Sequence, residues 1–124
     1  MPRLCINSRD ELIIIDLEKV AYLRAQGNYT EVMYIEGQSL LLTLGLSRLE
    51  TMIRDSMPKD RPGIFARMGR SLIINQRYLT RISVLNQKLT LSDRGKNSYT
   101  LSVPKDLLKG YKKAIAQAFA SSGK

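Results

Sequence analysis

The sequence of 124 residues contains no histidine, no tryptophan and a single cysteine. Without histidine, the chain lacks the commonest general base and metal ligand, and Ser-His-Asp and Cys-His catalytic systems are excluded. One cysteine can neither form an internal disulfide nor complete a zinc site. The glycine-rich loops that bind nucleotide phosphates are also missing. We therefore expect a protein that is not an enzyme and that requires no cofactor or metal.

The single cysteine and the absence of export signals bear on where the chain works. Cys5 lies between Leu4 and Ile6, and we expect it to be a small apolar core residue. No apolar run is long enough to span a bilayer, and the first twenty residues lack a secretory signal pattern. These features favour the cytoplasm. The length predicts one domain over residues 1–124, with a core from about residue 3 to 119.

Acidic residues are scarce in the second part of the chain. Residues 1–50 hold five Lys/Arg against seven Asp/Glu, a net charge of −2, whereas residues 51–124 hold fifteen against four, a net of +11. The stretch from 65 to 81 carries Arg67, Arg70, Arg77 and Arg81 and no acidic residue. This uneven distribution of charge predicts one basic face and an anionic partner. Nucleic acid and an anionic membrane surface both fit this description.

Short apolar and β-branched runs between turn residues predict a mostly β domain of the α+β class. We expect about ten short antiparallel strands in small stacked sheets. The predicted strands are 3–7, 11–16, 20–23, 29–35, 39–43, 64–68, 71–75, 82–85, 88–91 and 99–103. Turn residues favour hairpins at 27–28, 36–38 and 93–97, the last with Arg94 and Lys96 at its tip.

Two helices are predicted beside these strands. Ser47 and Glu50 have the spacing of a capping box, and the apolar residues that follow recur with helical period until Pro58. Pro104 begins a second, C-terminal helix. Its amphipathic stripe is expected to pack on the core and comprises Leu107, Leu108, Tyr111, Ala114, Ile115, Ala118 and Phe119. Because the most basic stretch is strand and loop, a helix-turn-helix protein is excluded.

Four segments, in order and at suitable separations, resemble one family. Residues 20–29 resemble its Tyr-Ile-Glu-x-x-x-Asn-Tyr segment, and residues 44–50 resemble its Leu-x-x-Leu-Glu helix start. Residues 65–75 resemble its Phe-x-Arg-Val-His-Arg-Ser-Tyr-Ile-Val-Asn signature, and residues 101–105 resemble its closing Ile-Pro-Val-Ser-Arg. Over nearly its whole length, the chain resembles a LytTR-type DNA-binding domain, the effector module of many bacterial response regulators.

The resemblance implies DNA reading by loops between strands, without a recognition helix. Carried over by position, its three contact regions are Asn28-Tyr29-Thr30, Gly69-Arg70-Ser71 and Lys105. The implied partner is double-stranded DNA, bound by a homodimer on repeated half-sites. A receiver domain or a sensor protein would complete the two-component system.

Each candidate residue has an expected role. Arg70 is the best candidate for a guanine contact, Asn28 could pair with adenine, and Thr30 could meet a thymine methyl or a phosphate. Lys105 could contact phosphate or guanine. The expected phosphate contacts are Arg67, Arg77, Arg81, Lys88, Arg94 and Lys96.

Structural roles compete with these assignments at several positions. Asn28 is equally well explained as a turn residue, and Tyr29 as a core or cross-strand aromatic. Asn75 is expected to cap a strand end or brace a turn. The chain also departs from the family where Gly69 replaces histidine, Leu72 replaces tyrosine and Pro104-Lys105 replaces Ser-Arg. Because lysine lacks the bidentate geometry of arginine, we expect an altered sequence preference.

The sequence thus predicts sequence-specific binding of double-stranded DNA and transcription regulation. The chain would act as the effector module of a response regulator or as a stand-alone regulator. The alternative is a basic β-rich module that binds a protein partner or an anionic membrane surface and has lost DNA readout.

Overall fold

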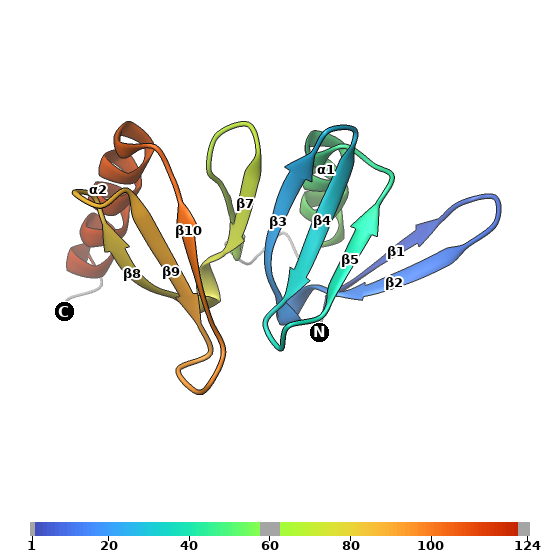
Figure 1. The fold of residues 1–124 in the computed structure, drawn as a ribbon, viewed down its shortest axis with the longest axis horizontal. Helices are drawn as coiled ribbons and strands as arrows, with labels where there is room; N and C mark the ends of the chain where they lie inside the picture. The colour runs from blue at the N-terminus through green and yellow to red at the C-terminus, as the bar shows by residue number, and fades with distance from the viewer. Residues whose placement is uncertain (1, 58–62, 122–124) are drawn as a thin grey trace. The chain divides into compact units, whose positions relative to one another are not determined.

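A computed structural model describes residues 2–57 and 63–121 of the chain (Figure 1). Within these ranges the chain forms ten strands and two α-helices, which confirms the predicted mostly β, α+β fold class. The chain divides into two compact units, Met1–Arg77 and Tyr78–Lys124. Neither helix in the described ranges is long and apolar enough to cross a membrane.

The first unit contains two antiparallel sheets. Strands β1 (Arg3–Asn7) and β2 (Leu12–Asp16) form a hairpin, which a short 3₁₀ turn (Leu17–Lys19) connects to the next sheet. That sheet has five strands in the order β5-β4-β3-β7-β6. The strands are β3 (Val20–Gln26), β4 (Tyr29–Tyr34), β5 (Ser39–Leu42), β6 (Phe65–Arg67) and β7 (Leu72–Asn75). β3 therefore lies at the centre, between its sequence neighbour β4 and the later strand β7.

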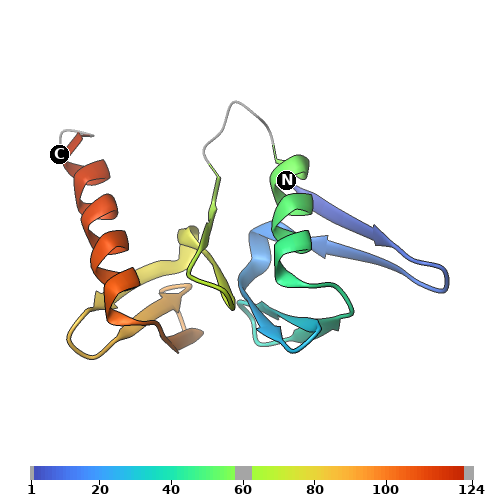
Figure 2. The same ribbon diagram turned by 90° about the horizontal axis from the view of Figure 1, so that it is seen from above.

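Helix α1 (Leu46–Ser56) lies along one face of the five-stranded sheet (Figure 2). Its apolar stripe is buried because it faces side chains of β3, β4 and β7, which point to that face at every second residue. The β1–β2 hairpin packs against the same helix. The buried core of this unit comprises Leu4, Ile15, Leu17, Val20, Leu23, Val32, Leu42, Leu46, Leu49, Ile53 and Ile73.

The predicted capping box at the start of α1 is wrong. The helix begins at Leu46, and its N-cap is Gly45, which makes no side-chain hydrogen bond. The carbonyl of Gly45 accepts the first helical hydrogen bond from the amide of Leu49. Ser47 lies inside the helix, and Glu50 binds Arg67 instead of reaching back to the cap. The expected stop at Pro58 lies outside the described residues.

Cys5 is exposed, so its predicted place in the core is wrong. Successive side chains of a strand point to opposite faces, and in β1 Leu4 is the residue that enters the core. Cys5 lies opposite Ile14, which is 50% exposed. Apolar neighbours in the sequence do not indicate burial in a two-stranded hairpin, because only one face of it is covered.

The predicted turns and the structural role of Asn75 are confirmed. Gly27, in the β3–β4 turn, and Gly37, in the β4–β5 turn, both have positive φ, which glycine adopts without strain. The side chain of Asn75 is fully buried at the end of β7. Its amide donates to the carbonyl of Val20 at 2.8 Å, and its Oδ1 accepts from the amide of Arg77 at 2.9 Å. One side chain thus ties the end of β7 to the start of β3.

The second unit is a three-stranded antiparallel sheet in the order β10-β9-β8, followed by helix α2. The elements are β8 (Leu79–Ser83), β9 (Lys88–Ser92), β10 (Ser98–Ser102) and α2 (Lys105–Ser121). β8 begins earlier than the predicted strand 82–85, and Leu85 lies in the following turn, 84% exposed. Gln87 closes that turn with φ +54 and donates its amide to the carbonyl of Val84.

Helix α2 buries only part of its apolar stripe, and Tyr111 and Ile115 are half-buried. Leu108 is fully buried, whereas Leu107 is 40% and Phe119 is 72% exposed. The predicted burial of the whole stripe is therefore wrong. A helix of 17 residues is about 25 Å long, whereas strands of five residues span about 17 Å. The small sheet cannot cover the full length of the helix.

Replacing Asn75 by alanine should lower the free energy of unfolding by about 2 kcal/mol, because the Val20 carbonyl and the Arg77 amide would lose their partner at a buried site. Urea denaturation followed by circular dichroism measures this loss. Asn7→Ala, at an exposed position of β1, is the matched control and should change stability by less than about 0.5 kcal/mol. Equal effects of the two substitutions would contradict the assigned role of Asn75.

Candidate nucleic-acid interface

Two turns of the first unit lie side by side at one end of the five-stranded sheet (Figure 1). β3 and β7 are antiparallel, with Leu23 opposite Ile73 and Arg24 opposite Leu72. The amide of Ala25 extends this pairing by donating to the carbonyl of Ser71 at 2.8 Å. The β3–β4 turn at 27–28 and the β6–β7 turn at 69–71 are therefore neighbours. We call them the turn pair.

The turn pair brings together four of the predicted contact residues. Asn28, Tyr29, Arg70 and Ser71 are all exposed there. Tyr29 is 46% exposed, and its backbone pairs with Gln26 across the hairpin. It is therefore not a core residue, and its ring is accessible. The contact regions that the resemblance implies at 28–30 and 69–71 thus form one surface.

Thr30 differs from its neighbours because it faces the core. Its side chain is fully buried, and its hydroxyl donates to the carbonyl of Leu44 at 2.8 Å. Alternation along β4 explains this, since Tyr29 points out and Thr30 points in. The expected contact of Thr30 with thymine or phosphate is therefore not available to its side chain. Thr30 instead anchors the segment between β5 and α1.

The β6–β7 turn has a defined backbone conformation. The amide of Met68 donates to the carbonyl of Leu72 at 2.7 Å, which closes the turn around residues 69–71. Gly69 has φ +79, a conformation that side-chain-bearing residues adopt at a cost. This explains locally why the chain has glycine here. Arg70 follows on the exposed outside of the turn.

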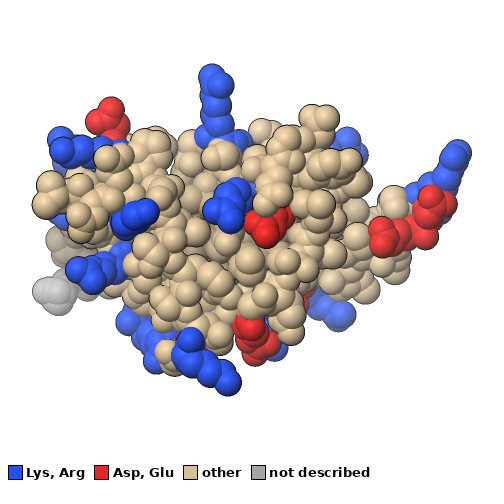
Figure 3. All heavy atoms as spheres, in the orientation of Figure 1, with Lys and Arg blue, Asp and Glu red and all other residues tan. Residues whose placement is uncertain are grey.

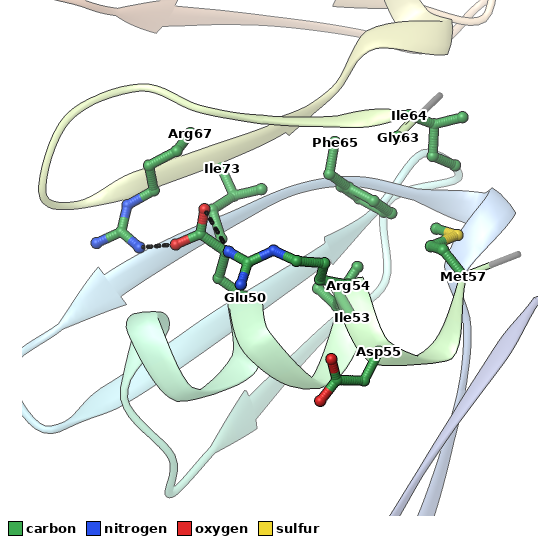
Figure 4. Close-up of a pocket in the computed structure, with 10 residues that line it drawn as sticks. All are labelled: Glu50, Ile53, Arg54, Asp55, Met57, Gly63, Ile64, Phe65, Arg67 and Ile73. Atoms are coloured by element: carbon green, nitrogen blue, oxygen red, sulfur yellow. Dashed lines mark hydrogen bonds and ion pairs between the residues drawn. The ribbon is translucent and has the colours of Figure 1, made fainter. Parts of the chain in front are cut away.

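Arg67 fills the inside of the same turn. Its Nε donates to the carbonyl of Gly69 at 2.7 Å, and its Nη2 donates to the carbonyl of Arg70 at 2.9 Å. Its Nη1 binds Oε1 of Glu50, on α1, at 2.7 Å (Figure 4). All three nitrogens are engaged, so the geometry does not support the predicted phosphate contact of Arg67.

The ion pair of Arg67 and Glu50 borders a pocket between α1 and β6 (Figure 4). The pocket has a volume of about 710 Å³, and its apolar side includes Ile53, Met57 and Phe65. Arg54 approaches the second oxygen of Glu50 at 3.8 Å. Glu50 thus receives cations from two directions, with the shorter contact to Arg67.

Arg77 lies away from the turn pair. It follows β7 at the end opposite the β6–β7 turn, and it forms an ion pair with Glu18 at 3.5 Å. Its side chain is 54% exposed, so a phosphate contact remains sterically open to it. Within the first unit, the sequence-predicted cations therefore do not form one cluster.

In the second unit, Arg94 and Lys96 are exposed at the tip of the β9–β10 hairpin. Asp93 shapes this tip, since its Oδ1 accepts from the amides of Gly95 at 2.8 Å and Asn97 at 3.2 Å. Arg94 has φ +62 and donates its amide to Oγ of Ser92. Figure 3 shows positive side chains extending from this hairpin and from the β6–β7 turn.

Lys105 lies at the other end of the second unit. It is the first residue of α2 and is exposed, whereas Arg94 and Lys96 lie across the length of β10 from it. Lys88 also lies at the α2 end, where its Nζ donates to Oγ of Ser102 at 2.8 Å. The second unit therefore presents cations at both ends of its sheet.

Arg24 and Gln26, beside the β3–β4 turn, are polar residues that the sequence pattern did not predict as part of the site. Arg24 forms an ion pair with Glu31 at 3.4 Å and lies 5.3 Å from the ring centroid of Tyr22. Gln26 donates to the same carboxylate at 3.1 Å. The predicted strand ended at residue 23, and β3 continues to Gln26. The turn predicted at 27–28 indicates this longer strand, because both strands of a tight hairpin extend to its turn.

The fold and the turn pair define a β-rich domain that presents exposed turns between its strands. One solved structure with this fold is the LytTr DNA-binding domain of a protein described as a methyl-accepting/DNA response regulator from Bacillus cereus. The two chains are 23% identical with a TM-score of 0.60, and the match covers 93% of this chain and 97% of the other. No curated protein matches this chain significantly.

The family model described as the LytTr DNA-binding domain matches residues 10–116. The chain belongs to the LytTR family of DNA-binding domains, which confirms the resemblance in its four segments. Family membership supports DNA binding, the first of the two functions that the sequence left open.

Gly69→Ala should lower the free energy of unfolding by about 1 kcal/mol, because the new Cβ is strained at φ +79. Thermal melting measures this change. Gly110→Ala provides the contrast, since Gly110 lies inside α2 with open space around it and alanine should raise stability there by about 0.5–1 kcal/mol. A neutral or stabilising Gly69→Ala would contradict the strained geometry of the turn.

The β9–β10 tip should show a measurable acid transition. The pKa of Asp93 is lowered, mainly by its hydrogen bond from the Asn97 side chain and then by that from the Gly95 amide. Because the folded pKa is the lower one, the stabilisation is present above the ordinary pKa and is lost as the pH falls through the folded value.

An NMR titration of the Asp93 carboxyl group tests this transition. Asn97→Ala should raise the pKa of Asp93 toward its ordinary value, because the first of these hydrogen bonds is removed. The Asp93 signal of the unmodified chain should titrate below the ordinary range for aspartate. An unchanged pKa in Asn97→Ala would show that this side-chain contact is absent in solution.

Proposed function

We propose that the turn pair of the first unit reads the base sequence of double-stranded DNA, with Arg70 as the main base-contacting residue. The observation that carries this proposal is the Ala25–Ser71 hydrogen bond, which holds the two turns beside each other. Asn28 and Arg70 therefore project from one rigid sheet end. DNA-binding side chains need such support, because a base contact depends on orientation as well as on charge.

The chemistry of Arg70 suits a guanine edge. Its guanidinium is a planar fork with parallel donors, and the N7 and O6 atoms of guanine accept such a pair in the major groove. The side chain is exposed, whereas the backbone that carries it is held by Arg67. Asn28 can offer an amide to adenine from the neighbouring turn, with Tyr29 and Ser71 placed for sugar or phosphate contacts.

The cations of the second unit supply sequence-independent affinity in this proposal. Arg94 and Lys96 stand at a hairpin tip, and Lys105 stands at the start of α2. Long cationic side chains on such positions bind phosphates without reading bases. Arg77, from the end of the first unit, can add a contact despite its ion pair with Glu18.

Both units serve one DNA-binding domain in this scheme, because the family model spans residues 10–116 and thus both of them. We further propose that the domain is the effector of a bacterial response regulator in the cytoplasm, and that it binds repeated half-sites as a homodimer. The fold shared with a response-regulator domain supports the first part. Size-exclusion chromatography with DNA of one and two half-sites tests the second.

The Arg70→Ala and Arg94→Ala variants separate reading from phosphate binding. Arg70→Ala should weaken binding to a duplex selected from a random pool by about 2 kcal/mol, and its affinity for unrelated duplexes should fall much less. Arg94→Ala should weaken binding to all duplexes alike. It should also reduce the slope of the logarithm of the binding constant against the logarithm of the salt concentration by about 0.9. Fluorescence anisotropy at several salt concentrations measures both effects.

The proposal fails if the unmodified chain binds every duplex with equal affinity, or if Arg70→Ala keeps its preference for the selected site. A flat salt dependence would exclude the phosphate contacts. Leu85→Ala, at an exposed position in the turn after β8, is a control that should leave binding unchanged.

A further inference from the structure

We propose that Glu50, on α1, is a positioning residue that sets DNA-sequence discrimination through Arg67 and the β6–β7 turn. This inference rests on the proposed role of Arg70. Glu50 does not belong to the turn pair, and its carboxylate binds Arg67 at 2.7 Å and lies 3.8 Å from Arg54. Glu50 acts on the β6–β7 turn through the guanidinium of Arg67.

Arg67 controls both peptide groups that flank the α-carbon of Arg70. The carbonyl of Gly69 belongs to the peptide group before Arg70, and the carbonyl of Arg70 belongs to the one after it. Both accept from the same planar guanidinium, at 2.7 and 2.9 Å. Since peptide groups are planar, holding both of them restricts the two backbone dihedrals of Arg70 and hence the direction of its side chain.

Glu50 keeps the guanidinium in this place. The side chain of Arg67 is 24% exposed, and its third nitrogen binds the carboxylate at 2.7 Å (Figure 4). A charge-assisted hydrogen bond of this length is among the stronger polar contacts of a protein. Without the carboxylate, Arg67 would be an uncompensated cation close to a DNA-binding turn, where a phosphate would attract it away from the two carbonyls.

Helix α1 gives Glu50 a rigid base. Leu49, its neighbour, is fully buried, and Ile53, one turn later, is 4% exposed. The backbone of Glu50 is therefore held by the apolar stripe of α1, which packs in the core. The chain of contacts runs from the core through Glu50 and Arg67 to the backbone of Arg70.

The test is Glu50→Gln, an uncharged side chain of the same shape. Its affinity for the selected duplex should fall on the order of tenfold, since the loss of one well-placed base contact has this size. Its affinity for an unrelated duplex should stay equal or rise, because the substitution removes a negative charge from a surface that faces phosphates. A general loss of folding would lower both affinities, so a loss confined to the selected duplex identifies positioning.

Glu36→Gln is the matched control. Glu36 is exposed in the β4–β5 turn, at the end of the sheet opposite the turn pair, and its substitution changes the charge by the same amount. The ratio of selected to unrelated affinity should be unchanged in this variant. A ratio lowered equally in Glu36→Gln and Glu50→Gln would overturn the proposal, because charge alone would then explain both.

Two further variants keep the test decisive if Glu50→Gln folds poorly. Arg67→Lys retains the charge but cannot bind two carbonyls and a carboxylate at once, so it should lose discrimination while keeping affinity for unrelated DNA. In an Arg70→Ala background, Glu50→Gln should cause no further loss of discrimination, because the side chain that it positions is gone. Additive losses would overturn the inference.

The outcomes distinguish this inference from the proposed function. If the unmodified chain does not discriminate between duplexes, the reading role of the turn pair fails. If the unmodified chain discriminates and Glu50→Gln and Arg67→Lys both retain the full ratio, only the positioning role fails.

Discussion

The pairing of β3 with β7 is the constraint on which the rest of the first unit depends. Residues 22–24 meet residues 72–74 across an antiparallel ladder, although the two segments are far apart in the sequence. At the end of the ladder away from the turn pair, the side chain of Asn75 ties β7 to Val20. At the end beside the turn pair, the Ala25–Ser71 hydrogen bond extends the ladder. Since β3 also pairs with β4, both turns of the turn pair come to the same sheet end.

The structure separates cations that shape the domain from cations that are available to a ligand. Arg67 donates through all three nitrogens to its own turn and to Glu50, whereas Arg70, three residues later, is exposed. Both lie in the same basic run, so charge counting treats them alike. Their difference arises because Arg67 lies on β6, next to α1, and Arg70 lies on the outside of the turn. The basic stretch thus contains one arginine that holds its own turn and another that is exposed.

Local pattern predicted most of the strands, because alternation and turn residues act over a few residues. Its errors share a physical cause. Ser47 and Glu50 have the spacing of a capping box, yet Glu50 binds Arg67 from a distant strand. Cys5 has apolar neighbours, yet β1 buries Leu4 on its only covered face. In each case a partner from elsewhere in the chain outweighed the local preference.

The sequence by itself determined the fold class, the positive charge of residues 51–124, the positions of the turns and the family. These follow from composition, periodicity and motif order, which need no knowledge of distant contacts. Only the tertiary structure decided that Thr30 faces the core, that Arg67 supports a turn and that residues 28 and 70 share one surface. The reason is that strand pairing and alternation assign each side chain to a face, and a side chain can act on a ligand only from the face that is left open.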